Sequence, residues 1–223
     1  MSSNVIIKIE NVKKTYTKSQ ALRGVSFVMN EGEEYLIRGA SGSGKSTLLY
    51  LLGGLDRPTE GRVIVNQNNL VDLSDEDLAL YRNRYVGFVF QFHFLLSSMN
   101  CMDNILLPAR LGGVESDEVV VRAKNLAKLL NVEHCLEKYP YELSGGEQQR
   151  INIIRALSLK PKLLLCDEPT GNLDSENSHK VIQLLRTLAK EFGATLVVVT
   201  HDPQIAQSFS NQLVMKDGLL ITQ

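Results

Sequence analysis

Two short glycine-rich motifs constrain this chain more than any other feature. The first is Gly39-Ala40-Ser41-Gly42-Ser43-Gly44-Lys45-Ser46, a complete G-x-x-x-x-G-K-S phosphate-binding loop. The second runs from Leu143 to Arg150 and reads Leu-Ser-Gly-Gly-Glu-Gln-Gln-Arg. Each motif occurs once in the 223 residues. We therefore expect a nucleotide site for which a single chain holds two unlike halves.

The first motif lies in the context that a phosphate-binding loop requires. A short apolar strand, Tyr35–Ile37, precedes it, and a helical pattern, Ser46–Leu52, follows. Glycines let successive backbone N–H groups turn toward phosphate oxygens, and the helix N-terminus adds partial positive charge. We expect Lys45 to reach the β and γ phosphates, Ser46 to ligate Mg²⁺, and Thr47 to lie beside the nucleotide.

A second chemical feature is an apolar strand that ends in two acids. Leu163–Cys166 is followed by Asp167 and Glu168, and Pro169 ends the strand. In open α/β sheets, binding sites lie at the carboxyl ends of the strands, where these acids would sit. A solvated acidic strand end is the simpler alternative, but the phosphate-binding loop upstream favours a site.

The second motif predicts another anion-binding helix start. Ser144, Gly145 and Gly146 precede an amphipathic helix expected over Glu147–Leu159. The glycines expose backbone N–H groups, and Ser144 adds a hydroxyl donor. An ordinary helix cap would look the same. One nucleotide cannot occupy both loops of one fold if they lie on different faces.

The order of short apolar runs and helical patterns predicts an α/β fold built on a mainly parallel sheet covered on both faces. The expected strands are Val5–Ile9, Tyr35–Ile37, Arg62–Val65, Val86–Phe90, Leu163–Cys166 and Leu196–Thr200, and further helices are expected over Asp117–Leu130 and Ser178–Ala189. The start (5–29) and the end (Gln212–Ile221) read as antiparallel strands. We interpret residues 1–223 as a single domain, with a sheet core plus β subdomain over about 1–95 and 157–223 and an inserted helical subdomain over about 96–156.

Composition limits the partners of this chain. It carries 24 basic and 25 acidic side chains, so the net charge of −1 gives no electrostatic case for nucleic-acid binding. The three scattered cysteines favour a reducing compartment. We expect no secretion signal and no transmembrane segment, because the longest apolar stretch, Leu48–Leu55, falls far short of about 18 residues. If the protein works at a membrane, another polypeptide crosses it.

Taken together, the motifs resemble those of the ABC class of ATPases. Their order is Tyr16, the phosphate-binding loop, Gln91, the Leu143–Arg150 motif, the acidic strand, Gly171–Asp174 and His201, so the likeness covers the chain from Val5 to about Leu220. It implies a P-loop nucleotide hydrolase core with an antiparallel β subdomain and an inserted helical subdomain. It also implies hydrolysis of ATP to ADP and phosphate with Mg²⁺, coupled to mechanical work across a membrane.

The resemblance assigns a role to each remaining candidate. Asp167 matches the acid that holds Mg²⁺, and Glu168 matches the general base that polarises the attacking water. His201 matches the histidine that contacts the γ phosphate and orients Glu168. Gln91 matches a glutamine whose amide senses Mg²⁺ or the attacking water, so Ser46, Gln91 and Asp167 form the expected metal set. Tyr16 stands where the family places an aromatic ring on adenine.

The resemblance also predicts that the active unit contains two copies of this chain. In the family, the signature loop, here Ser144-Gly145-Gly146, meets the γ phosphate bound by the opposite subunit. Gly171-Asn172-Leu173-Asp174 resembles the loop that runs along this interface. Two ATP molecules would then lie between two chains related by a two-fold axis.

A narrower likeness points to a bacterial subfamily that comprises lipoprotein-releasing (LolD-type), efflux (MacB-type) and cell-division (FtsE-type) ATPases. The segments that carry it are Leu51–Asp56, Gly87–Leu96, Glu168–Asp174 and Gln212–Leu219, and Phe92–Leu96 with the chain end is most similar to the lipoprotein-releasing members. This implies a peripheral subunit on the cytoplasmic face of the inner membrane, bound to integral permease subunits and driving lipoprotein release. The segment Ser97–Cys101 departs from the subfamily pattern near the groove for the membrane partner.

Three alternatives remain. An efflux ATPase is the nearest, and an ATPase that signals to a cell-wall hydrolase differs from the first reading only in its partner. A non-transport ABC protein acting on DNA or ribosomes fits least well, because the chain has neither a long coiled coil nor a second phosphate-binding loop.

Overall fold

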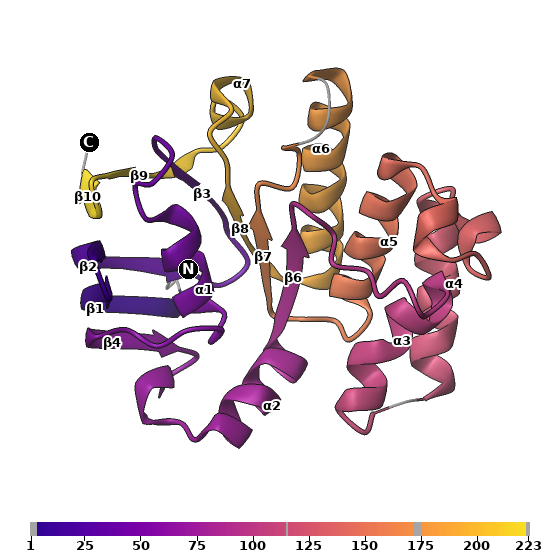
Figure 1. The fold of residues 1–223 in the computed structure, drawn as a ribbon, viewed down its shortest axis with the longest axis horizontal. Helices are drawn as coiled ribbons and strands as arrows, with labels where there is room; N and C mark the ends of the chain where they lie inside the picture. The colour runs from indigo at the N-terminus through magenta and orange to yellow at the C-terminus, as the bar shows by residue number, and fades with distance from the viewer. Residues whose placement is uncertain (1–3, 115, 172–174, 222–223) are drawn as a thin grey trace.

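The protein is described here by a computed structural model covering residues 4–114, 116–171 and 175–221. Figure 1 shows two sheets, with a group of helices on the side away from the smaller sheet. The larger sheet has the strand order β10-β9-β3-β8-β7-β6. Its strands are β3 (Glu34–Arg38), β6 (Val86–Phe90), β7 (Leu163–Asp167), β8 (Thr195–Val199), β9 (Asn211–Lys216) and β10 (Leu219–Ile221). All neighbours are parallel except the β9–β10 pair.

The central strands are buried on both faces, as their nearly continuous apolar sequences predict. In β7, Leu163 and Leu165 join one hydrophobic core, whereas Leu164 and Cys166 join the other. The parallel register pairs Cys166 with Val198 and Asp167 with Val199. The expectation of a mainly parallel, doubly covered sheet is therefore confirmed.

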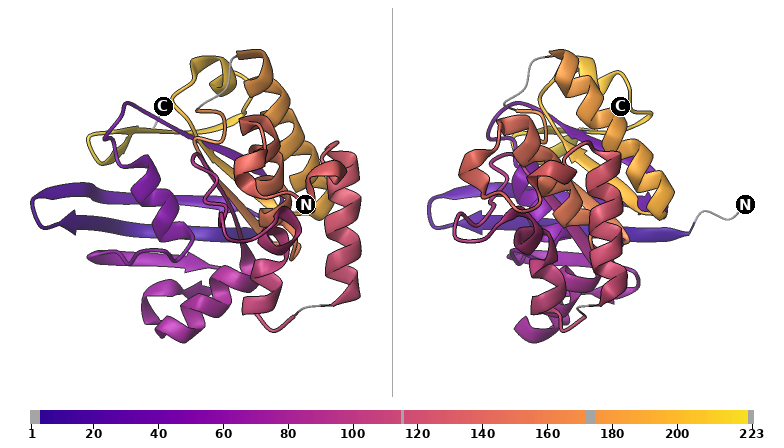
Figure 2. Two further views of the ribbon diagram at one scale, coloured as in Figure 1. Left: turned by 45° about the vertical axis from the view of Figure 1, so that its right-hand side comes forward. Right: turned by 90° about the vertical axis from the view of Figure 1, so that its right-hand side faces the viewer.

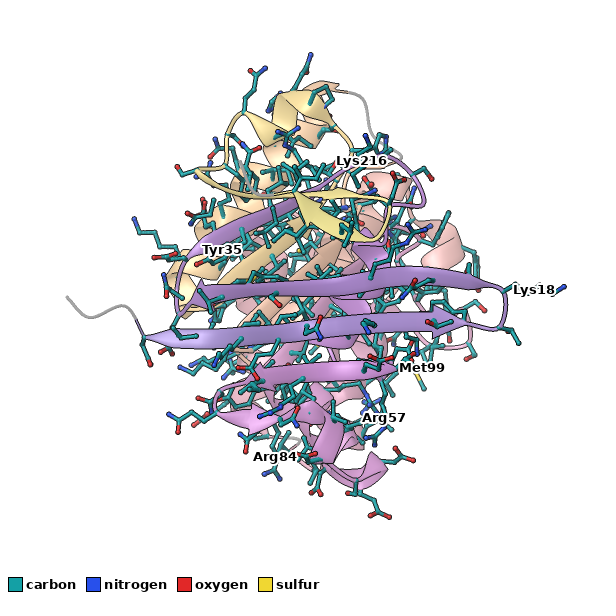
Figure 3. The ribbon with its side chains drawn as sticks, turned by 90° about the vertical axis from the view of Figure 1, so that its left-hand side faces the viewer. Lys18, Tyr35, Arg57, Arg84, Met99 and Lys216 are labelled. Atoms are coloured by element: carbon teal, nitrogen blue, oxygen red, sulfur yellow. The ribbon has the colours of Figure 1, made fainter. Side chains whose placement is uncertain are left out.

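The smaller sheet is antiparallel and has the strand order β2-β1-β4-β5. It comprises β1 (Val5–Tyr16), β2 (Ser19–Asn30), β4 (Glu60–Val65) and β5 (Asn68–Asn69). Figure 3 shows these long strands from the side, with Lys18 pointing away from the molecule at the β1–β2 turn. Their inner side chains and those of α1 (Lys45–Leu52) form one core with β3, β7 and β8.

Three of the helices follow β6 in sequence and pack together before the chain returns to β7. They are α3 (Cys101–Leu111), α4 (Asp117–Leu129) and α5 (Gly145–Leu157), with the 3-10 turns η2 (Glu133–Cys135) and η3 (Pro140–Glu142) between α4 and α5. The views in Figure 2 place them on the opposite side of the molecule from the antiparallel sheet. The remaining elements are η1 (Leu70–Asp72), α2 (Asp75–Tyr85), α6 (Ser175–Phe192) and α7 (Pro203–Ala206).

Several element boundaries differ from the sequence-based expectation; β1, for example, extends to Tyr16, beyond the expected Val5–Ile9. The helix expected over Glu147–Leu159 is α5, which begins two residues earlier because the Ser144 hydroxyl accepts from the Glu147 N–H and so caps the helix at Ser144. The expected C-terminal hairpin is present, with Asp217 (φ 51°) and Gly218 (φ 77°) in its turn. However, β9 also pairs in parallel with β3, so the hairpin extends the main sheet.

The cysteine side chains lie in the interior of the protein. All three cysteines are buried and free. Burial raises the pKa of the Cys166 thiol well above its usual range. Among the described residues, every helix is too short or too polar to cross a lipid bilayer.

Candidate active site

The phosphate-binding loop connects β3 to α1 and depends on its glycines. Gly42 and Gly44 have φ angles of 77° and 98°, a region that side-chain-bearing residues rarely adopt. A Cβ atom on Gly44 would come within 2.5 Å of the Ala21 carbonyl oxygen, and one on Gly39 within 2.1 Å of the Met215 carbonyl oxygen. The loop therefore packs closely between β2 and β9, and only glycine fits at these positions.

Lys45 is held at the centre of this loop. Its Nζ donates to the carbonyl oxygens of Gly39 and Ala40, both at 2.9 Å. The side chain is buried, and these two bonds satisfy two of the three N–H donors of an ammonium group that has little contact with water. This geometry keeps a positive charge beneath the loop.

A cleft of about 660 Å³ opens beside the loop and gathers most of the predicted site residues. It is lined by Ala21, Ala40, Ser41, Gly42, Gly44, Lys45, Ser46, Thr47, Gln91, Glu168 and His201. These residues come from β2, the loop, α1 and the carboxyl ends of three neighbouring strands. The structure thus brings together side chains that are up to 180 positions apart in the sequence, from Ala21 to His201.

Ser46 lines the cleft and forms an oxygen pair with Asp167, which is buried behind it and is not among the lining residues. The Ser46 hydroxyl donates to Asp167 Oδ1 at 2.9 Å, and the Tyr50 hydroxyl donates to Asp167 Oδ2 at 2.9 Å. Burial, followed by the bond to Asp167, raises the pKa of Tyr50 to about 12. The phenol therefore keeps its proton at neutral pH and donates a hydrogen bond to Asp167. Both carboxylate oxygens of Asp167 are therefore oriented.

Tyr50 was not predicted from the sequence, although a signal for it exists. It lies four positions after Ser46 on α1, so the helical repeat places both side chains on one face. The role of Tyr50 depends on a contact with a residue 117 positions away, which the local pattern does not show.

Glu168 and His201 meet at the edge of the cleft. His201 Nδ1 and Glu168 Oε1 are 2.9 Å apart. Glu168 has a φ angle of 45°, which is uncommon for a residue with a side chain. Its other oxygen, Oε2, is buried and has no hydrogen-bond partner among the described residues. One carboxylate oxygen thus contacts the histidine, and the other is free to form a further hydrogen bond.

Gln91 lies against the loop that follows Glu168. A Cβ atom on Gly171 would come within 2.5 Å of Gln91 Nε2, so this glycine makes room for the amide. From the other side, Gln149 Nε2 donates to the Pro169 carbonyl oxygen at 2.7 Å. Of the expected interface loop, Asn172, Leu173 and Asp174 lie outside the described residues.

Tyr16 stands at the end of β1, outside the residues that line the cleft. Its hydroxyl donates to Asp56 Oδ2 at 2.7 Å, and the Lys14 ammonium lies 4.9 Å from the ring centroid. Burial, followed by the bond to Asp56, raises the pKa of the phenol, whereas the Thr47 hydroxyl lowers it. Tyr16 is therefore close to the phosphate-binding loop with its ring direction fixed by Asp56 and Lys14.

The second motif lies away from this cleft, at the start of α5. The Ser144 hydroxyl donates to Glu147 Oε2 at 2.6 Å, and the Ser144 N–H donates to the same oxygen at 2.8 Å. These bonds hold the pKa of Glu147 at about 2. The residues that line the cleft do not include Ser144, Gly145 and Gly146. Within one chain, the second motif therefore lies apart from the nucleotide cleft.

Two polar residues without a role in the sequence analysis tie α5 to the segment after Gln91. Asn152 Nδ2 donates to the Phe90 carbonyl oxygen at 3.1 Å. Arg155 donates to the carbonyl oxygens of Phe94 at 2.7 Å and His93 at 2.5 Å, and burial lowers its pKa to about 10. On the main sheet, Arg38 at the end of β3 donates to Gln212 Oε1 on β9 at 2.8 Å.

Comparison with known proteins identifies the family. Residues 22–171 match the family described as ABC transporter. The chain belongs to the ABC transporter family. It is 43% identical, over 98% of its length and 93% of the relative, to the lipoprotein-releasing system ATP-binding protein LolD of Shewanella frigidimarina. It is 42% identical to the protein of the same name from Cytophaga hutchinsonii, over 97% and 99% of the two chains.

Solved structures of ABC cassettes share the fold. A dimeric bacterial ABC transporter cassette, MJ0796, superposes with a TM-score of 0.89 at 40% identity and 97% coverage of both chains. A structure of the same cassette in a post-hydrolysis state, bound to ADP and Pi, gives the same values. The CbiO1 subunit from Clostridium perfringens gives a TM-score of 0.87 at 31% identity, over 99% of this chain and 88% of the other.

These findings confirm the predicted fold class and the ABC ATPase family, and with them a nucleotide-binding, ATP-hydrolysing activity. The roles of individual residues stay predictions, supported by the arrangement described above.

Proposed function

We propose that this chain is the ATP-hydrolysing subunit of a lipoprotein-releasing ABC transporter, bound to the cytoplasmic face of a bacterial inner membrane. The observation that carries the proposal is identity of 42–43% over almost the whole chain to two proteins named for that system. Efflux and cell-division ATPases remain possible outcomes of the test below.

In the proposed reaction, the cleft binds ATP, with the phosphates against the loop N–H groups and Lys45. Glu168 accepts a proton from the attacking water through its unpaired Oε2, while His201 orients the carboxylate through Oε1. Gln91 lies close enough to this loop to align the water. Tyr16, held by Asp56, offers its ring to the adenine.

The donor set suits Mg²⁺, which prefers hard oxygen ligands. The Ser46 hydroxyl and Asp167 carboxylate already lie 2.9 Å apart, and Tyr50 orients the second carboxylate oxygen. Ser46 and Asp167, with the Gln91 amide nearby, would hold the ion. When bound, Mg²⁺ supplies charge neutralisation at the phosphates.

The site also needs a second copy of the chain. Ser144, Gly145 and Gly146 form an anion-binding helix start that does not line the chain's own cleft. In a two-fold dimer, each chain would present this start to the nucleotide of its partner. The relative MJ0796 has been solved as a dimer, which supports this arrangement.

An exposed apolar surface beside Gln91 suits the membrane subunits. Phe92 and Phe94 expose 69% and 61% of their surface, and Leu111 at the end of α3 exposes 77%. A hollow of about 790 Å³ between α2 and α3 is lined by Leu80, Leu107 and Leu111 among others. Arg155, which donates to the Phe94 carbonyl oxygen, also lines it. Apolar surface gathered in this way is characteristic of protein contacts.

The test is to purify the tagged Glu168→Gln chain from detergent-solubilised membranes with ATP and identify the co-purifying proteins. Two membrane proteins with large periplasmic domains, together with bound lipoprotein, would support lipoprotein release. The matched control carries Lys45→Ala as well, which removes the phosphate contact and should reduce recovery of any ATP-dependent complex.

Other results would overturn the proposal. A single membrane protein accompanied by an efflux duct or a cell-wall hydrolase would assign the chain to efflux or to cell division. Recovery of the chain alone in the soluble fraction would favour a non-transport ABC protein.

A further inference from the structure

Outside the nucleotide cleft, three side chains with metal-ligating atoms converge near the signature motif. They are His134 and Cys135 in η2 and Glu147 in the first turn of α5. His134 Nε2, Cys135 Sγ and a Glu147 carboxylate oxygen all lie within 4.8 Å of one another. Among the described residues, this is the only such group of His, Cys, Asp or Glu.

We propose that His134, Cys135 and Glu147 form a binding site for a thiophilic divalent cation such as Zn²⁺. Nitrogen, sulfur and carboxylate oxygen are the donors that zinc takes in proteins, and three of them with one water complete a tetrahedral shell. The site would be separate from the Mg²⁺ position proposed at Ser46 and Asp167, where hard oxygen donors meet.

The existing distances are close to those of a zinc shell. His134 Nε2 lies 3.0 Å from Glu147 Oε1, and Cys135 Sγ lies 3.4 Å from the same oxygen. Zinc bond lengths of about 2.0–2.3 Å at tetrahedral angles place an N···O pair at roughly 3.3 Å and an S···O pair at roughly 3.5 Å. These two pairs would therefore separate by only a few tenths of an ångström, and the His134 ring would turn toward Cys135.

The cluster is accessible from solvent on one side. The His134 side chain is 59% exposed and the Glu147 side chain is 21% exposed, whereas Cys135 is buried beneath them. Binding replaces the Cys135 S–H bond by an S–metal bond and releases the thiol proton to solvent. No electron transfer is needed, because zinc has one stable charge state.

A plain interpretation of the same cluster is an ion pair between His134 and Glu147 with a thiol–carboxylate hydrogen bond. It requires no metal and predicts no specific binding. The two interpretations differ in whether the Cys135 sulfur can form a metal bond, which is directly measurable.

A regulatory consequence rests on the proposed function. The other Glu147 oxygen, Oε2, accepts from the Ser144 hydroxyl, the group that would contact the partner's γ phosphate. A cation on Oε1 would fix the carboxylate and with it Ser144. We therefore expect bound Zn²⁺ to slow ATP turnover at constant Mg²⁺.

In the first experiment, the full chain is treated with EDTA, freed of EDTA and nucleotide, and titrated with Co²⁺. The buffer contains a phosphine reductant, which keeps the cysteines reduced. We expect a thiolate-to-cobalt charge-transfer band that saturates at one equivalent and disappears when Zn²⁺ is added. His134→Gln should weaken Co²⁺ binding at least tenfold, and Cys135→Ser should remove the band. Cys101→Ser, another buried cysteine in the helical region, is the matched control and should retain it.

Absence of the band in the wild-type chain at a hundredfold excess of Co²⁺ would overturn the site, as would a band that survives Cys135→Ser. The exposed His134→Gln variant guards against loss of folding, because a surface substitution should leave the circular dichroism spectrum unchanged.

The second experiment compares Zn²⁺ inhibition of ATP hydrolysis between the wild-type chain and His134→Gln. We expect the variant to need at least tenfold more Zn²⁺ for half-inhibition. Equal sensitivity, with the Co²⁺ band present, would overturn the regulatory consequence. A chain without any ATP hydrolysis would instead contradict the proposed function, and the Co²⁺ titration would still decide the metal site.

Discussion

At the scale of single residues, Glu168 is the side chain that we propose as the general base. Its backbone is strained, and its Oε1 contacts His201. Its Oε2 has no hydrogen-bond partner among the described residues, so this oxygen could accept a proton from a water. We expect Glu168→Gln to lower ATP turnover by at least about 100-fold, because the amide cannot accept the proton. Steady-state phosphate release measures this. Turnover at the wild-type rate would contradict the assignment, provided that nucleotide binding is unchanged.

Tyr50 is expected to act as a positioning residue for Asp167. Tyr50→Phe removes one hydrogen bond to the carboxylate without changing the ring. We expect the Mg²⁺ concentration for half-maximal ATP hydrolysis to rise about tenfold, since groups that orient metal ligands typically have effects of this size. The maximal rate at saturating Mg²⁺ should change much less.

Tyr81→Phe is the matched control for this prediction. The Tyr81 hydroxyl also bonds to α1, through the Leu52 carbonyl oxygen, but it does not touch Asp167. If both variants shift the Mg²⁺ dependence equally, Tyr50 acts through the stability of α1 and not through Asp167.

The sequence predicted the residues of the site that belong to fixed-spacing motifs and missed those that support them. Lys45, Asp167 and Glu168 could be found because each stands beside a recognisable strand end or helix start. The contacts of Asp56 and Tyr50 could not be predicted, because they are made with Tyr16 and Asp167, which lie 40 and 117 positions away.

At the scale of elements, α5 links the two half-sites. Its first turn carries the signature glycines, and Arg155 near its end holds the carbonyl oxygens of His93 and Phe94. Both residues have left-handed backbones, with φ angles of 61° and 48°, so this segment depends on outside bonds.

Arg155→Met should therefore lower the free energy of unfolding by about 2 kcal/mol, because two carbonyl groups lose a charged donor. Urea unfolding at neutral pH measures the change. Arg62→Met, at an exposed position of β4, is the matched control, and we expect it to change stability by less than about 0.5 kcal/mol. A similar effect of both substitutions would show that Arg155 has no special role.

The start of α5 predicts a dependence of stability on pH. The Ser144 bonds, with His134 and Cys135 nearby, lower the Glu147 pKa from 4.5 to about 2, so the ionised form is favoured in the folded chain. This stabilisation is present above the unfolded pKa of 4.5 and is lost as the pH falls toward 2. We expect the stability difference between the wild-type chain and Glu147→Gln to shrink as the pH falls below 4.5.

Urea unfolding in EDTA at several pH values tests this expectation. Glu76→Gln, in the first turn of exposed α2, is the matched control for removing a helix-start carboxylate. A Glu147→Gln difference that stays constant across this range would contradict the assigned capping role.

The order of the elements was more predictable than their sheet partners. Repeats of two and 3.6 residues identify strands and helices locally, which is why the six expected strands are present. The pairing of β9 with β3 joins Leu36 to Gln212, a contact that neither segment signals by itself.

At the scale of the whole molecule, the two anion-binding loops belong to different parts of the fold, and the residues of the second loop do not line the cleft beside the first. The phosphate-binding loop lies in the sheet core, and the signature loop lies at the start of a helix in the group packed on the other side (Figure 1). We propose that a complete site needs two chains, and binding of ATP should then favour the dimer by mass action. The sequence predicts this division only through the family resemblance, because spacing along the chain does not reveal how far apart the two loops lie in the folded protein.

We expect the Glu168→Gln chain to elute as a dimer in size-exclusion chromatography with ATP and as a smaller species without it. Adding Ser144→Arg should abolish the ATP-dependent dimer, because the arginine side chain fills the space of the partner's γ phosphate. The same variant should still bind ATP, with an affinity within about threefold of that of the parent, since its own cleft lacks Ser144.

Ser210→Arg, at an exposed position before β9, is the matched control and should leave the dimer intact. Loss of ATP binding by the isolated Ser144→Arg chain would mean that both loops serve one nucleotide, and the two-chain site would have to be abandoned.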